Sequence, residues 1–142
     1  MRREDIPPFR EFEHTGDLGI EVVAASRGEL FRCAAIGLAS PLVEMNTIEA
    51  KKERGVVVEA QTDADLTHDL LAELLYFFDP QGFIWRDASV KEEDRSLRVT
   101  LRGERFDPAR HVFRREIKAI TYHQLMVTQS PNGWLATVIF DI

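Results

Sequence analysis

Apolar positions recur with helical spacing in two segments of the chain. The first segment, 26–42, starts with Ser26 followed three residues later by Glu29, a capping box that marks the beginning of a helix. Pro41 is expected to end this helix, because proline does not extend the hydrogen-bond ladder. The apolar positions of the segment share one helical face: Leu30, Phe31, Ala34, Ala35 and Leu38.

The second helical segment is 63–79, "DADLTHDLLAELLYFFD". Asp63 or Asp65 is expected to be its N-cap, because aspartate is favoured at that position. Pro80 and Gly82 are expected to end it. Its wide apolar face consists of Leu66, Leu70, Leu71, Leu74, Leu75 and Phe78.

The rest of the chain is rich in β-branched and aromatic residues, which is typical of strands. We expect strands at 12–26, 53–61, 83–90, 96–104, 116–129 and 134–142. The turn signal "SPNGW" predicts that the last two form a hairpin. Two principal helices among mainly antiparallel, hairpin-linked strands predict an α+β fold. We expect one domain over 1–142, with a loose lead-in at 1–10.

Composition narrows the choice of partners. The chain has 142 residues, 44% of them hydrophobic, which suffices for one substantial core. Its formal net charge of -6 makes it a poor candidate for binding nucleic acid through the phosphate backbone. The same charge favours binding a cation or a basic protein surface.

The single cysteine, Cys33, has no partner for an intramolecular disulfide, which favours a reducing compartment. No segment has the apolar length of a signal peptide core or a membrane span, so we expect a soluble cytoplasmic protein. Cys33 lies inside the first predicted helix, and we interpret it as a small core residue rather than a nucleophile.

Common catalytic and metal motifs are missing from the sequence. The four histidines form no HExxH pattern, and one cysteine does not make a cysteine-rich zinc site. There is no GxSxG elbow and no GxxxxGK[ST] phosphate loop. The sequence therefore gives little support to a structural zinc site or to nucleophilic catalysis.

Two aspartates occur in apolar strand contexts, Asp17 in "EHTGDLGI" and Asp141 in "VIFDI". Aspartate is disfavoured in strands, so each position needs an explanation. Each one either marks a strand end that faces water, or belongs to a site for a hard cation such as Ca²⁺, Mg²⁺ or Mn²⁺. Ile142 would add its terminal carboxylate and carbonyl to such a site. Lys118 either extends to water or neutralises a carboxylate cluster.

At several places the sequence resembles the archease family. "FEHTGDLGIEV" is similar to the family's Y/F-E-H-T-A-D-I/L opening, with Gly16 in place of the usual alanine. "EIKAITYHQLMV" resembles its E-V/I-K-A-I/V-T-Y-H motif, and "VIFDI" its V-x-x-D-I ending. "DLLAELLYFFD" is similar to the family's L-x-E-L-L-Y helix, and "RHVFRREIK" keeps a histidine ahead of the K-A-I-T-Y motif. The resemblance covers nearly the whole chain.

The resemblance implies an accessory protein of the GTP-dependent RNA ligase that joins tRNA exon halves. Such a protein promotes guanylylation of the ligase and allows multiple turnover, and it is not itself an enzyme. The resemblance places a divalent-metal site on Asp17, Asp141 and Ile142. Further candidates follow from the same motifs: Asp63 and Asp65 as weaker metal ligands, and His14, Lys118 and His111 as residues that serve the partner.

Two other functions stay open on the sequence alone. Clustered aspartates also occur in metal-dependent phosphoesterases and nucleases, where the metal activates water. The chain is also compatible with a general chaperone-like module that binds proteins without a metal. Whether RNA touches the protein directly is left open as well.

Overall fold

The computed structural model describes residues 9–14 and 16–142. Strands and helices follow one another along this part of the chain in an irregular order. The elements are β1 (Phe9–His14), β2 (Asp17–Ala24), α1 (Arg27–Leu42), η2 (Met45–Thr47), β3 (Lys52–Glu59), α2 (Asp63–Phe78), β4 (Phe83–Glu92), β5 (Ser96–Arg105), β6 (Ala119–Ile120), β7 (Met126–Ser130) and β8 (Gly133–Asp141).

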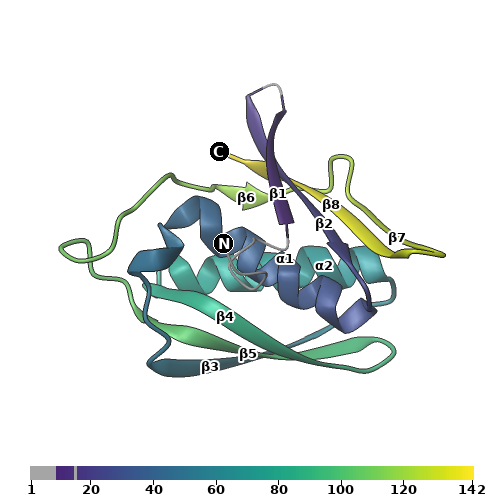
Figure 1. The fold of residues 1–142 in the computed structure, drawn as a ribbon, viewed down its shortest axis with the longest axis horizontal. Helices are drawn as coiled ribbons and strands as arrows, with labels where there is room; N and C mark the ends of the chain where they lie inside the picture. The colour runs from purple at the N-terminus through teal and green to yellow at the C-terminus, as the bar shows by residue number, and fades with distance from the viewer. Residues whose placement is uncertain (1–8, 15) are drawn as a thin grey trace.

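The described strands form two antiparallel sheets with the helices between them (Figure 1). The five-stranded sheet has the order β1-β2-β8-β6, and β7 also pairs with β8. The three-stranded sheet has the order β3-β5-β4. Both helices contact strands of both sheets, so one core lies between the layers. The predicted α+β class with two principal helices is confirmed.

Helix α1 begins as the sequence predicts. The Ser26 hydroxyl accepts a hydrogen bond from the Glu29 N–H at 3.3 Å. The predicted end at Pro41 is slightly wrong, because Pro41 lies within the last turn and the helix runs to Leu42. Pro41 has no N–H, so the hydrogen bond that this turn would make to the Gly37 carbonyl is absent. Val43 then adopts an extended conformation and closes the helix.

Helix α2 has a different N-cap from the one predicted. Thr62, rather than Asp63 or Asp65, precedes the helix, and its hydroxyl accepts from the Asp65 N–H at 3.1 Å. Threonine is also a favoured N-cap residue, so the residue type alone does not distinguish Thr62 from Asp63 and Asp65. The helix ends at Phe78 and the chain turns through Gly82, which has a φ of +75°. No helix of the described part of the chain is long and apolar enough to cross a membrane.

Two predicted strands each prove to be two shorter strands. The segment 12–26 belongs to the hairpin of β1 and β2, which turns at Gly16 with a φ of +80°. Strand β1 begins at Phe9, so the last two residues of the expected lead-in are in a sheet. The segment 116–129 divides into β6 and β7, and Gln124, with a φ of +52°, lies in the loop between them. The predicted hairpin of the last two strands is confirmed by the pairing of Ser130 with Gly133.

The core is centred on α1, which is buried on most of its surface. Phe31 and Leu38 are fully buried, and the buried Trp85 of β4 donates its indole N–H to the Ala35 carbonyl at 2.8 Å. Removing an indole N–H from water without a partner is costly. This hydrogen bond therefore fixes how α1 lies on the three-stranded sheet.

Gly103 marks a close approach of two strands in that sheet. It pairs with Trp85 next to a register shift in β4. A Cβ at Gly103 would lie 2.5 Å from the Trp85 Cα and would collide with the Ile84 carbonyl oxygen. Both obstacles are backbone atoms, so neither can move aside as a side chain would.

We expect Gly103→Ala to lower the free energy of unfolding by about 2 kcal/mol or more, because the two strands must separate to admit the methyl group. Gly55→Ala is the matched control, since a Cβ at Gly55 on the neighbouring strand meets nothing within 4 Å. Its effect should be within about 0.5 kcal/mol. Urea denaturation of both variants measures the difference, and equal stabilities would contradict the expected clash.

Candidate functional site

Asp17 and Asp141 lie at the ends of two neighbouring antiparallel strands. Leu18 pairs with Phe140, so the same register extended by one residue brings Asp17 opposite Asp141. Leu18 and Phe140 belong to the core, and successive side chains of a strand point to opposite faces. The two carboxylates therefore share the outer face of the five-stranded sheet, with a Cβ separation of about 5 Å.

Strand β6 brings the "KAI" segment to the other side of Asp141. Ala119 pairs with Asp141, and the Lys118 N–H donates to the Asp141 carbonyl at 2.7 Å. Lys118 is exposed, and Ile142 packs against the core and so holds the end of β8 in place. Figure 1 shows this end of β8, marked C, beside the β1–β2 hairpin and β6.

The β1–β2 hairpin brings a further predicted residue, His14, to the same end of the five-stranded sheet. His14 pairs in register with Asp17, and Thr15 between them lies outside the described residues. The structure thus brings the main chains of His14, Asp17, Asp141 and Lys118 together from three distant parts of the sequence.

The oxygen atoms available at this point suit a hard cation. Carboxylates and main-chain oxygens are the ligands that Ca²⁺, Mg²⁺ and Mn²⁺ prefer, and Asp17, Asp141 and Ile142 carry them. Among the side chains that the structure describes, no three from histidine, cysteine, aspartate or glutamate converge as a metal site. A cation held by this pair of aspartates would therefore need further ligands, from Ile142, from water or from another molecule.

The weaker candidates at the start of α2 have other neighbours. The Asp63 carboxylate accepts from the Arg27 guanidinium at 2.8 and 2.9 Å, and Arg27 also binds Glu92 at 2.8 Å. Arg27 therefore links the two helices and the end of β4, and Asp63 is one of its partners. Asp65 lies further along the helix, where its charge acts on Tyr122.

His111 is buried in a different cluster. Its Nδ1 accepts from the Asp107 N–H at 2.8 Å, and its Nε2 lies 2.9 Å from the Glu104 carboxylate. A backbone N–H is only a donor, so Nδ1 carries no proton and Nε2–H donates to Glu104. These contacts make His111 a structural residue that ties its loop to the end of β5.

Glu104 is the charged centre of that cluster. It is buried, and it accepts from the Glu49 N–H at 2.6 Å, from His111 and from the Arg110 guanidinium. Burial alone would raise the pKa of Glu104, but the hydrogen bonds from Glu49, His111 and Arg110 outweigh it and lower the pKa to about 2. The carboxylate therefore stays ionised and holds the segment after η2, β5 and the loop after β5 together.

Cys33 is confirmed as a core residue. It is buried on α1, and burial together with the nearby Glu29 carboxylate raises the pKa of its thiol to about 12. The thiolate is the nucleophilic form of cysteine, so this side chain is inert near neutral pH.

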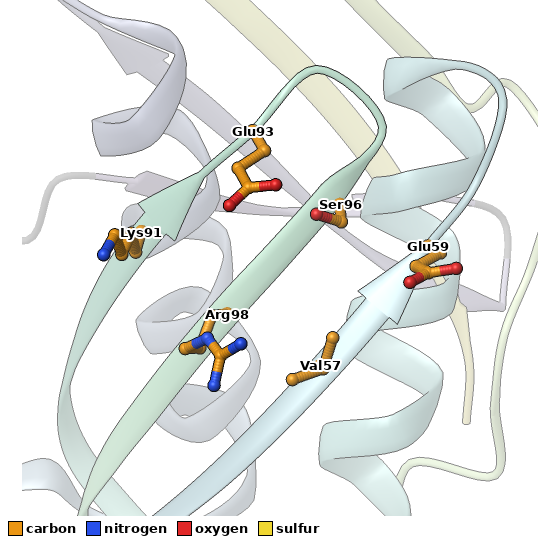
Figure 2. A pocket seen from close by; sticks show the side chains of 6 residues that line it. All are labelled: Val57, Glu59, Lys91, Glu93, Ser96 and Arg98. Atoms are coloured by element: carbon orange, nitrogen blue, oxygen red, sulfur yellow. The ribbon is translucent and has the colours of Figure 1, made fainter.

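A shallow depression of about 410 Å³ lies on the outer face of the three-stranded sheet (Figure 2). It holds acidic and basic side chains together, so it presents no single charge to a ligand. It is also built from strands other than those that carry Asp17 and Asp141. Its lining consists of Val57, Glu59, Lys91, Glu93, Ser96 and Arg98.

Sequence patterns gave no sign of two contacts that the structure reveals. Nothing in "RGERFDP" distinguishes the buried Glu104 from the exposed glutamates, because its partners are distant in sequence. His68 on α2 stacks on Tyr122 of the "TYH" motif at 3.8 Å between ring centroids. The only related feature visible in the sequence is the composition of α2, which carries His68: it is acidic and contains no lysine or arginine.

Comparison with known proteins identifies the family of this chain. The model of the Archease protein family (MTH1598/TM1083) matches residues 9–142, which includes every strand and helix described above. The chain belongs to the archease family. The resemblance of its motifs to that family is thereby confirmed.

Several archease relatives align along almost their whole length. Protein archease of Pyrococcus abyssi is 37% identical over 139 residues, covering 94% of this chain and 98% of the relative. Protein archease of Methanopyrus kandleri is 32% identical, covering 95% and 99%. The solution structure of Methanobacterium thermoautotrophicum protein 1598 superposes with a TM-score of 0.79 at 26% identity, covering 96% of this chain and 100% of that one.

A further archease, described as a possible chaperone, comes from Thermotoga maritima. Its crystal structure superposes with a TM-score of 0.64 at 24% identity, covering 94% of this chain and 96% of that one. At this level of identity the comparison shows a shared fold.

The Glu104 cluster predicts how stability depends on pH. Because the folded-state pKa is about 2 and the ordinary value is 4.5, Glu104 stabilises the fold above about pH 4.5. That contribution is lost as the pH falls toward 2. Glu104→Gln should therefore be less stable than the native chain by about 2 kcal/mol at pH 7, with the difference shrinking in acid.

Urea denaturation at several pH values between 7 and 2 tests this expectation. Glu93→Gln is the control, since Glu93 is exposed in the turn between β4 and β5. A Glu104→Gln variant whose deficit is the same at every pH would contradict the ionic role of Glu104.

Proposed function

We propose that this chain is a cytoplasmic accessory protein of the GTP-dependent tRNA-splicing RNA ligase. In this role it promotes guanylylation of the ligase and permits multiple turnover, and it catalyses no ligation itself. A divalent cation, Ca²⁺, Mg²⁺ or Mn²⁺, takes oxygen ligands from Asp17, Asp141 and Ile142. Membership of the archease family supports the choice of partner.

One observation carries the proposal: the register of β2 and β8 brings Asp17 opposite Asp141 on the outer face of the sheet. Like charges directly opposite each other destabilise a sheet, and a cation between them relieves the repulsion. Because these residues offer fewer ligands than a hard cation takes, coordination positions stay open for groups of the ligase. Lys118 lies next to this point and is available to an anionic group.

The overall charge supports this role. The chain carries 24 acidic and 18 basic residues, a formal net charge of -6. An enzyme that holds RNA needs a basic surface, and opposite charges on two proteins speed their encounter. The contact is therefore with the ligase rather than with the RNA backbone.

The general chaperone alternative makes a different prediction from the ligase activator. A chaperone without a metal suppresses aggregation of unrelated proteins, and a chelator does not change that effect. A metal-dependent phosphoesterase, the other alternative, releases phosphate or nucleotide without any ligase present. We expect neither activity in the purified protein.

A guanylylation time course of the cognate ligase at excess RNA tests the proposal. We expect the native chain to support multiple turnover, and Asp141→Asn and Asp17→Asn to lose most of the stimulation. Asp94→Asn is the matched control, since it removes one charge from an exposed turn of the other sheet. Full stimulation by both site variants, with fold confirmed by circular dichroism, would overturn the metal role. Absence of stimulation by the native chain would overturn the proposal that the ligase is its partner.

The metal itself is tested by calorimetric titration with Mn²⁺ and Ca²⁺. Removing one of two facing carboxylates should weaken affinity by about tenfold or more in Asp17→Asn and in Asp141→Asn. The affinity of Asp94→Asn should match that of the native chain. Equal affinities of the native chain and all three variants would mean that the cation binds elsewhere.

A further inference from the structure

Helix α2 presents an acidic stripe on its outer side. Asp65, Asp69, Glu73 and Tyr76 follow one another at helical spacing and lie on one face, about 16 Å from first to last along the helix axis. The helix contains no lysine or arginine to pair with them. Among the described residues, no ion pair to Asp65 or Glu73 is formed.

Helix stability does not explain this stripe. Acidic residues favour the first turn of a helix, which accounts for Asp63 and Asp65. Asp69 and Glu73 lie beyond that turn, and like charges four residues apart destabilise a helix. The stripe therefore carries a small cost in the isolated chain that a basic partner would remove.

A rigid aromatic ring lies beside the stripe. Tyr122 stacks on His68 with 13° between the ring planes, yet it is 59% exposed. The two nitrogens of His68 face the Asp69 carboxylate at 3.0 Å and the Ile120 carbonyl at 3.2 Å. These two contacts fix the orientation of the His68 ring. Tyr122 is thus held in place before any partner arrives, which lowers the entropic cost of binding.

Tyr76 lies on the stripe and Tyr122 lies beside it, and both are exposed. The chain has two tyrosines, and Tyr76, at the far end of the stripe, is 53% exposed. Partial desolvation and the charges of Asp69 and Asp65 raise the pKa of the Tyr122 hydroxyl, which places both carboxylates near that ring. Tyrosine is enriched among the residues that dominate binding energy in protein interfaces.

We propose that Asp65, Asp69, Glu73, Tyr76 and Tyr122 form a docking surface for an arginine-bearing segment of a protein partner. Arginine fits this chemistry better than lysine, because its planar guanidinium both stacks on an aromatic ring and pairs with carboxylates. Strand β6 connects this surface to the candidate metal site, since His68 lies 3.2 Å from the Ile120 carbonyl and β6 pairs with the end of β8.

The inference rests on the proposed function only for the identity of the partner. Two experiments therefore test the docking surface and the proposed function separately. The first measures the affinity of the ligase for Asp65→Asn/Asp69→Asn/Glu73→Gln and for Tyr122→Ala. We expect each to weaken binding by about tenfold or more, and Tyr122→Phe, which keeps the ring, to lose much less. A triple variant of equal charge on the other sheet, Glu59→Gln/Glu93→Gln/Asp94→Asn, is the control. Native-like binding by the α2 variants, with helicity intact, would overturn the inference.

The second experiment needs no ligase. A hexa-arginine peptide titrated into the labelled native chain should shift the amide resonances of α2 and of residues 121–125, and a hexalysine peptide should shift them less. Shifts concentrated on other elements, equal effects of both peptides, or no shifts at all would each overturn the docking surface. If the peptide result holds and the ligase neither binds nor responds, the proposed function fails while the surface stands.

Discussion

The register between β2 and β8 is the constraint on which both the core and the candidate site depend. Along β8, Ala136, Val138 and Phe140 are fully buried, and the residue after them, Asp141, is exposed. A slip of one residue would turn Asp141 inward and expose the apolar set, at a cost of several buried side chains. The hydrophobic core therefore determines where the two carboxylates stand, and no contact between the acids themselves is needed to align them.

Ionic groups play two opposite parts in this molecule. Arg27 and Glu104 each bind several partners and join segments far apart in the sequence. Their charges are therefore neutralised within the fold. Asp141 and the α2 stripe lie at the surface, where their charges act outward. The first kind of group keeps the layers together, and the second kind determines which surfaces the molecule can approach.

Much of this architecture was predictable, because local signals and the fold agree. The capping box at Ser26 marked a helix start, and the apolar setting of Asp17 and Asp141 singled out two residues that the structure brings together. The hairpin at Gly16 and the loop at Gln124 were not predicted. Each depends on one residue with positive φ inside a stretch of strand-like composition, and a glutamine gives no warning of that conformation. Buried ionic clusters were missed because their partners meet only after folding.

The burial of α1 between the sheets also sets how the molecule opens. Every residue from Cys33 to Ala39 is buried, so water reaches the backbone in the middle of this helix only when one sheet separates from the core. Amide protons in the middle of α1 should therefore exchange with solvent through unfolding of the whole molecule. We therefore expect the two sheets to unfold as one cooperative unit, because both pack against this helix.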